Sequence, residues 1–254
     1  MKYGISNIAI VPMRAEPSDK SEMTNQVLFG EHFKVIEQEN KFSKIVLSHD
    51  CYEGWICNKQ WLEINEENYK SLSKEVSTIT IDILDIIKKD SHQPIVIGSI
   101  LPNYKSGHAL INNEMYQFEG LTTPGFAKKE KLIENAFIYL NAPYLWGGRS
   151  PLGIDCSGLS QMAYRLQGIN LPRDAYQQAE IGTTVVTLEE SEAGDLAFFE
   201  NNEGKIVHVG IILENNYIIH ASGKVRIDSI DKQGIFNKEL AAYTHKLRLI
   251  KSIC

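Results

Sequence analysis

The pattern of apolar residues changes near Pro124, and this change limits the folds open to the chain. Upstream of it, in residues 1–64, short β-prone runs alternate with polar turns. The runs lie at 8–11, 33–36, 44–47 and 54–57, and the turns at 14–26, 37–43 and 48–53. Several short strands with regular turns predict a small β-barrel. Downstream, a helix expected over 127–140 is followed by a series of strands, which predicts an α+β domain over residues 126–254.

Between these parts the pattern is less regular. Residues 65–75 are polar enough for a linker or a short helix. Ser77–Ile83 alternates with period two and favours a strand, whereas residues 83–89 fit a helix equally well. Further strands are expected at 94–100, 107–111 and 114–118. We therefore predict a linker over 65–75 and a second, degenerate barrel over 76–125.

Composition excludes some classes of partner. The chain has 254 residues and a net charge of −6, so it has no basic footprint for nucleic acid or for an anionic membrane. Its four cysteines, at 51, 57, 156 and 254, form neither a CxxC pair nor a zinc spacing. A disulfide between Cys51 and Cys57 is compatible with the sequence, but reduced thiols are the expectation. We expect no metal and no other cofactor.

The first residues bear on localisation. Met1–Pro12 lacks the unbroken apolar core and the small-residue cleavage site of a signal peptide. No stretch approaches the roughly 20 apolar residues of a membrane span. The sequence as given therefore predicts a cytoplasmic protein, whereas a signal peptide encoded upstream would predict an exported one.

Cys156 stands where a glycine-rich loop gives way to an amphipathic helix. Gly147 and Gly148 precede it, and apolar residues at 159, 162, 163 and 166 follow at helical spacing, with Gly168 as the expected stop. A helix N-terminus lowers the pKa of a thiol and so favours the nucleophilic thiolate. A free cysteine is also commonly a small buried hydrophobe, so position alone leaves catalysis and packing as equal alternatives.

Two histidines favour catalysis. Residues 205–213 and 216–223 read as two strands joined by a tight turn at Glu214–Asn216, which predicts a hairpin. Adjacent antiparallel strands can place His208 and His220 side by side on one face. A thiol nucleophile needs a base, and the base needs a group that orients it. We therefore predict Cys156 as nucleophile, His208 as general base and acid, and His220 as the residue that orients His208.

These residues belong to a longer series of motifs. In chain order they are Tyr144-Leu-Trp-Gly-Gly148, Asp155-Cys-Ser-Gly158, Leu171-Pro-Arg-Asp174, Gly194-Asp-Leu-Ala-Phe-Phe199, His208-Val-Gly210 and His220-Ala-Ser222. The series resembles that of NlpC-type cell-wall peptidases, which are papain-like cysteine peptidases that cut peptidoglycan stem peptides. The resemblance implies a papain-like domain over 126–254 and the same Cys–His–His triad. It also implies that Tyr144 supports an oxyanion site beside the backbone N–H of Cys156.

The first part of the chain carries a second resemblance. The loop Arg14-Ala-Glu-Pro17 and the strand Gly54-Trp-Ile56 resemble those of bacterial SH3-like domains. Two SH3-like domains before an NlpC-type peptidase resemble the γ-D-glutamyl-L-diamino acid endopeptidases of murein recycling. This resemblance implies cleavage between D-Glu and meso-diaminopimelate or lysine in a stem peptide with a free N-terminal L-Ala. A murein stem peptide is thus the expected partner.

A free ammonium group needs carboxylate and hydroxyl partners in a closed pocket, and a blocked amine leaves those groups unpaired. Candidate partners are Asp174, and Glu22 or Glu16 with Tyr52. The position after Asp174, often serine in the family pattern, is Ala175 here, so a hydroxyl contact is lost.

Residues around the nucleophile offer further substrate contacts. Asp155 and Ser157 flank Cys156, where they can contact peptide or cap the helix. Trp146 can line a groove or lie in the core. Arg173 can clamp a carboxylate or pair with a neighbouring acid.

Three functions fit the sequence. The leading one is a cytoplasmic cysteine endopeptidase acting on free stem peptides, in which His208 removes the Cys156 proton during attack or beforehand, as a thiolate–imidazolium pair. The second is an exported wall hydrolase anchored by SH3-like domains. The third is a non-catalytic peptide-binding protein. The sequence does not decide between diaminopimelate and lysine, and it does not give the oligomeric state.

Overall fold

The computed structural model describes residues 1–124 and 130–253. The chain divides into two compact units, Met1–Phe126 and Ala127–Cys254, each described here by itself. Strands make up 46% of the described residues and helices 15%, a sheet-rich balance that the expected α+β class does not specify.

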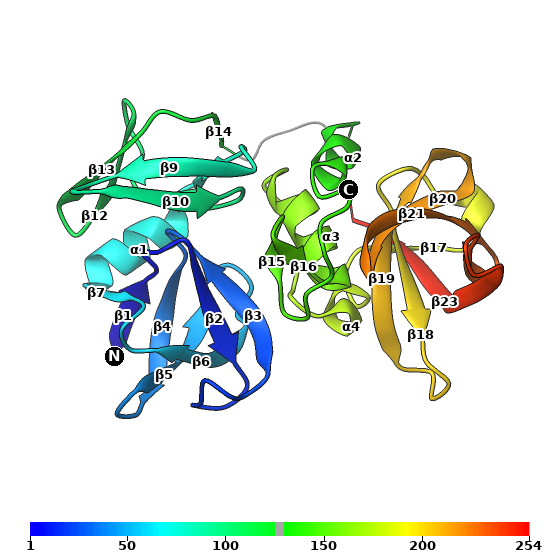
Figure 1. The fold of residues 1–254 in the computed structure, drawn as a ribbon, viewed down its shortest axis with the longest axis horizontal. Helices are drawn as coiled ribbons and strands as arrows, with labels where there is room; N and C mark the ends of the chain where they lie inside the picture. The colour runs from blue at the N-terminus through cyan, green and yellow to red at the C-terminus, as the bar shows by residue number, and fades with distance from the viewer. Residues whose placement is uncertain (125–129, 254) are drawn as a thin grey trace. The chain divides into compact units, whose positions relative to one another are not determined.

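The first seven strands of unit 1 form one antiparallel sheet in the order β3-β2-β6-β5-β4-β1-β7 (Figure 1). Alternation builds its core: Val11 and Met13 of β2 are fully buried, and their neighbours are only partly so. The strands are β1 (Lys2–Ile5), β2 (Ile10–Arg14), β3 (Met23–Leu28), β4 (His32–Gln38), β5 (Phe42–Leu47), β6 (Glu53–Cys57) and β7 (Leu62–Ile64).

The sequence pattern missed three of these strands. β1 and β7 are short, and β3 begins inside the segment expected to be a turn at 14–26. Two polar residues of β3, Asn25 and Gln26, are buried. Polar side chains at buried positions remove the apolar alternation on which strand prediction depends. Cross-strand pairing with β2 stabilises β3 instead.

The segment predicted as a linker is helical. Helix α1 spans Glu66–Lys74, and the Asn65 side chain caps it by accepting a hydrogen bond from the backbone of Asn68 at 2.7 Å. Leu72 is buried in a core that also holds Tyr3 and Phe118. One hydrophobic core therefore joins α1 to both parts of unit 1, and of the two alternatives for residues 65–75 the structure shows the short helix.

Residues after α1 form two small antiparallel sheets, ordered β10-β9-β13-β12 and β11-β8-β14. Residues 84–88, which fitted a helix equally well, form a strand because they pair with β10 and β13. The strands are β8 (Thr78–Thr80), β9 (Leu84–Lys88), β10 (His92–Val96), β11 (Ile100–Leu101), β12 (His108–Ile111), β13 (Glu114–Phe118) and β14 (Thr122–Thr123).

Unit 2 begins with three helices, α2 (Glu130–Phe137), α3 (Cys156–Arg165) and α4 (Ala175–Gln178), with the small β15–β16 ribbon (Arg149–Ser150 and Gly153–Ile154) between the first two. Residues 127–129 of the helix predicted over 127–140 lie outside the described part. Strands and 3₁₀ turns follow: β17 (Thr183–Val185), η1 (Leu188–Glu190), β18 (Leu196–Glu200), β19 (Ile206–Leu213), η2 (Glu214–Asn216), β20 (Tyr217–Ser222), β21 (Lys224–Asp231), β22 (Gly234–Asn237) and β23 (Ala242–Ser252).

The sheet of unit 2 closes on itself. Its order is β17-β23-β18-β19-β20-β21-β22, and β22 also pairs with β23, so strands β18–β23 form a closed ring (Figure 1). The expected α+β domain did not specify that its sheet closes into a barrel. Closure removes the exposed edges that an open sheet would leave. Helix α3 packs against β19 and β20, which carry the two predicted catalytic histidines.

Two smaller expectations concern cysteines and membranes. Cys51, Cys57 and Cys156 are free thiols, and Cys254 lies outside the described residues. In residues 1–124 and 130–253, no helix has the length and apolar character needed to cross a membrane.

Candidate active site

Cys156 is the first residue of α3, and the loop before it fixes this helix start. Asp155 is the N-cap: its Oδ1 accepts a 2.7 Å hydrogen bond from the backbone N–H of Gly158. A Cβ on Gly158 would lie 2.3 Å from the carbonyl oxygen of Gly148. Glycine is therefore required here, because the loop and the first turn of the helix approach each other too closely for a side chain.

Asp155 and Arg173 form a buried ion pair beneath the nucleophile. Arg173 Nη2 donates to Asp155 Oδ2 at 2.6 Å, and its Nη1 donates to Asp155 Oδ1 at 3.0 Å and to Ser157 Oγ at 2.8 Å. The backbone N–H of Gly147 also donates to Asp155 Oδ2, at 2.8 Å. Asp155 could contact substrate or cap the helix, and Arg173 could clamp a substrate carboxylate or pair with an acid. The geometry favours the second role for each residue, because their polar atoms bond within the protein.

The thiol lies in a closed environment. Cys156 is buried at the start of α3, the helix that packs against β19 and β20. Burial, followed by the charge of Asp155, raises the pKa of the Cys156 thiol to about 12 against the smaller opposing effect of backbone N–H groups nearby.

Tyr144 approaches the same site from the preceding loop. It forms a parallel bridge with Ile154, two residues before Cys156. Burial raises the pKa of the Tyr144 hydroxyl, and the charge of a Cys156 thiolate adds to the effect. Tyr144 therefore remains a neutral donor near the sulfur, as an oxyanion contact requires.

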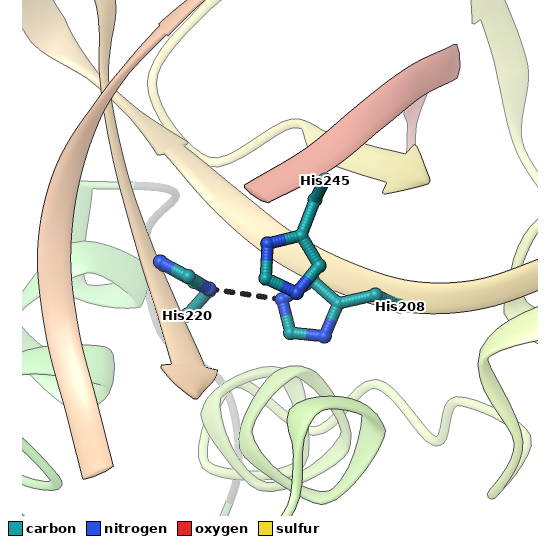
Figure 2. Close-up of side chains that lie close together, drawn as sticks. All are labelled: His208, His220 and His245. Carbon is teal, nitrogen blue, oxygen red and sulfur yellow. Dashed lines mark hydrogen bonds between the residues drawn. The ribbon is translucent and has the colours of Figure 1, made fainter. Parts of the chain in front are cut away.

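The two histidines meet across the predicted hairpin. Gly210 of β19 lies opposite His220 of β20, so His208, two residues earlier, is the diagonal neighbour of His220 on the same face. His208 Nε2 and His220 Nδ1 are 2.9 Å apart (Figure 2). The turn is the 3₁₀ element η2, in which Asn215 and Asn216 have positive φ. The other ring nitrogen of His208, Nδ1, lies on the side of the ring away from His220.

Two residues of the site were not predicted. Asp228 of β21 accepts a hydrogen bond from His220 Nε2 at 3.1 Å. His245 of β23 stacks on the His208 ring, with centroids 4.1 Å apart and planes 23° apart (Figure 2). No sequence motif marks either one. Their only signal is the alternation of β21 and β23, and this cannot be used until the order of the strands is known.

The three imidazoles are the residues best placed to hold a metal ion, since one nitrogen of each lies within 4.8 Å of the others. Zinc requires lone pairs directed at one centre, at about 2.0–2.1 Å from each nitrogen. An imidazole lone pair lies in the ring plane, and the rings of His208 and His245 are nearly parallel. Their lone pairs therefore do not converge, so we interpret the cluster as a proton relay with a stacked neighbour.

The remaining predicted contacts lie at different depths. Asp174 is half-buried at the start of α4, and its backbone N–H donates to Gln177 Oε1 at 3.1 Å. Trp146 is 59% exposed, so the alternative that placed it in the core is wrong. In unit 1, Glu16 and Glu22 are exposed, and Tyr52 packs against the core of the barrel. Their contact with substrate remains a prediction.

Burial shifts the pKa values of His208 and Cys156 in opposite directions. Burial, with smaller contributions from His245 and His220, lowers the pKa of His208 well below 6.5. Burial raises the pKa of the thiol, so both shifts favour the neutral forms of the thiol and the imidazole. This favours proton transfer during attack over a preformed thiolate–imidazolium pair. A thiol, a neutral base and a nearby hydroxyl donor are together the groups needed for acyl transfer.

Comparison with known proteins agrees with this chemistry. Residues 141–244 match the NlpC/P60 family, and residues 13–60 match the bacterial dipeptidyl-peptidase SH3 domain. A protein of Bacillus subtilis strain 168 named gamma-D-glutamyl-L-lysine dipeptidyl-peptidase is 40% identical over 248 residues, which cover 85% of this chain and 79% of that protein. Dipeptidyl-peptidase 6 of Lysinibacillus sphaericus is 29% identical over 257 residues, covering 89% and 92%.

The fold has a counterpart that spans both units. The crystal structure of an NlpC/P60 family protein from Bacillus cereus ATCC 10987 superimposes with a TM-score of 0.84 over 99% of each chain, at 18% sequence identity. At that identity the match is one of fold alone. The family match covers Cys156, His208 and His220, and the Bacillus subtilis relative extends the similarity over most of the chain. This chain belongs to the NlpC/P60 family.

Proposed function

We propose that this protein is a cysteine endopeptidase that hydrolyses the bond between D-Glu, through its γ-carboxyl, and a diamino acid in peptidoglycan stem peptides. One observation carries the proposal: the helix that begins with the Cys156 thiol packs against the two strands that carry a buried pair of hydrogen-bonded histidines, in a chain 40% identical to a gamma-D-glutamyl-L-lysine dipeptidyl-peptidase. The intact thiol disfavours the alternative of a non-catalytic binding protein.

The geometry supports the following sequence of steps. His208 Nδ1 takes the proton of Cys156 as the sulfur attacks the γ-carbonyl carbon of D-Glu. The backbone N–H of Cys156, one of the donors that a helix start leaves without an intrahelical acceptor, and the Tyr144 hydroxyl stabilise the oxyanion. His208 then protonates the departing amine, and water hydrolyses the thioester with His208 again acting as base.

We further propose that the substrate is a free peptide with an N-terminal L-Ala, and that the enzyme acts in cytoplasmic murein recycling. Asp174 with Glu22 and Tyr52 are the candidates for binding the substrate ammonium. Lysine and diaminopimelate both fit at the third position, and the name of the Bacillus subtilis relative favours lysine.

Residues 76–125 are proposed to be a second, divergent SH3-like domain. This segment contains seven short strands, β8–β14, each of five residues or fewer and all paired antiparallel, which supports this assignment. The shared core with α1 supports treating residues 1–124 as one folded unit.

Mass spectrometry of products tests the function. The purified protein is incubated with L-Ala-γ-D-Glu-L-Lys, with the diaminopimelate peptide, with the N-acetylated form of each, and with intact peptidoglycan. Release of L-Ala-D-Glu from the free peptides alone is expected. Cleavage of the blocked peptides or of intact wall would favour an exported wall hydrolase, and no cleavage of any substrate would contradict the proposal. Cell fractionation tests the cytoplasmic location separately.

A further inference from the structure

Strand register places a carboxylate behind the two-histidine relay. In the β20–β21 pairing, His220 lies opposite Arg226 and Ile218 lies opposite Asp228. Asp228 is therefore the diagonal neighbour of His220 on the same face of the sheet. His208 on β19, the other strand beside β20, is likewise a diagonal neighbour of His220. The polar atoms of three adjacent strands thus form one row from His208 through His220 to Asp228.

Arg226 holds the carboxylate in place. Its Nε donates to Asp228 Oδ2 at 2.7 Å and its Nη2 donates to Oδ1 at 3.0 Å, a two-point contact that fixes the plane of the carboxylate. Asp228 is buried, and His220 is fully so. Burial raises the pKa of Asp228, but the hydrogen bonds from His220 and Arg226 outweigh it and hold the pKa below its usual value. The group is therefore ionised at neutral pH.

An ionised carboxylate only accepts hydrogen bonds, so it determines where the proton of each imidazole sits. His220 Nε2, facing Asp228, must carry a proton, which leaves the lone pair on His220 Nδ1. His208 Nε2 then donates to that lone pair, and His208 Nδ1 retains its own. This is the nitrogen that faces away from His220 and that the mechanism uses as base.

We propose that Asp228, clamped by Arg226, is a positioning residue that fixes the tautomers of His220 and His208 and so keeps the base nitrogen of His208 unprotonated. The role of His208 as base rests on the proposed function. The tautomer assignment itself rests only on the hydrogen-bond row.

An asparagine at 228 removes this constraint. Its amide presents one acceptor and one donor, so in either orientation its NH₂ group meets the Arg226 guanidinium, and neither orientation is strongly preferred. When the NH₂ group faces His220, the opposite tautomers of both histidines become favourable, and His208 then presents N–H to the thiol. We expect Asp228→Asn to populate both tautomers and to lower kcat roughly 10- to 100-fold with little change in KM.

Long-range ¹H–¹⁵N spectra of ¹⁵N-histidine-labelled protein, with resonances assigned by single His→Gln variants, report the tautomers without substrate. The wild type is expected to show His220 as Nε2–H and His208 as Nε2–H. A His220 Nδ1–H tautomer in the wild type would overturn the proposal, and this readout needs neither substrate nor turnover.

Two variants separate the carboxylate from its surroundings. Asp231→Asn is the matched control: it lies on the same strand, but its carboxylate bonds Tyr243 rather than the histidines, and we expect wild-type tautomers and kcat. Arg226→Met keeps the carboxylate and is expected to keep the Nε2–H tautomer of His220. Wild-type kcat together with a single tautomer in Asp228→Asn would also overturn the proposal. If the wild type cleaved no peptide but showed the expected tautomers, the proposed function would fail and this inference would stand.

Discussion

The ion pair beneath the nucleophile offers a test of what keeps the helix start in place. Arg173 is 1% exposed and donates three hydrogen bonds, two to Asp155 and one to Ser157. Arg173→Met retains an unbranched apolar side chain but leaves the Asp155 carboxylate buried without this cation. Removing one partner of a buried pair typically costs about 3–5 kcal/mol in the free energy of unfolding.

The structure places this substitution near the lower end of that range. Asp155 keeps two backbone donors, Gly147 and Gly158, which continue to satisfy one lone pair on each carboxylate oxygen. We therefore expect Arg173→Met to lower the free energy of unfolding of unit 2 by about 3 kcal/mol. Asn also caps helices well, so Asp155→Asn removes the charge while keeping the cap. In the Arg173→Met background, Asp155→Asn should cost less than it does in the wild type.

Hydrogen exchange measured by mass spectrometry at increasing urea suits this comparison, because peptides from β18–β20 report the unfolding of unit 2 separately from unit 1. The four proteins of the double-mutant cycle yield the coupling free energy between Arg173 and Asp155. A cost below about 1 kcal/mol for Arg173→Met, or a coupling near zero, would refute the argument that the pair supports the nucleophile loop.

Three further predictions concern turnover. Cys156→Ala should lower kcat/KM by roughly 10³-fold or more and leave circular dichroism unchanged; near-full activity would mean that another residue is the nucleophile. Burial lowers the pKa of His208, and its neutral form is the base, so activity should fall only as pH drops through that lowered pKa. The acid limb of the kcat/KM profile should therefore lie below pH 6.5, and a limb above pH 6.5 would contradict this reasoning. In Gly210→Ala, the new Cβ would lie 2.7 Å from Ile218 Cδ1 and 3.0 Å from His220 Cβ. We therefore expect the free energy of unfolding to fall by about 1–3 kcal/mol and kcat to fall as well. Wild-type values in urea titration and in the peptide assay would instead show that β19 and β20 separate freely.

Local patterns in the sequence determined the parts of the site that are close together along the chain. Cys156 begins a helix because Asp155 caps it and Gly158 allows the loop to approach, and both signals lie within three residues of the thiol. The His208–His220 hairpin is similarly local, since two strands joined by a short turn have few possible registers. The roles of these three residues were predicted from the same motifs.

Only the tertiary structure decided which distant strands meet. Asp228 and His245 reach the relay because β21 pairs with β20 and because the ring of strands closes through β22 and β23. Strand β3 was missed, and helix α1 was not separated from a linker, for a related reason: buried polar residues stabilise β3 and a shared core stabilises α1, and neither leaves a periodic signal. Local propensity acts over a few residues, whereas sheet order is set by the burial of side chains far apart in the chain. The sequence pattern therefore predicts a nucleophile and a base, but it does not reveal Asp228 and His245 beside them.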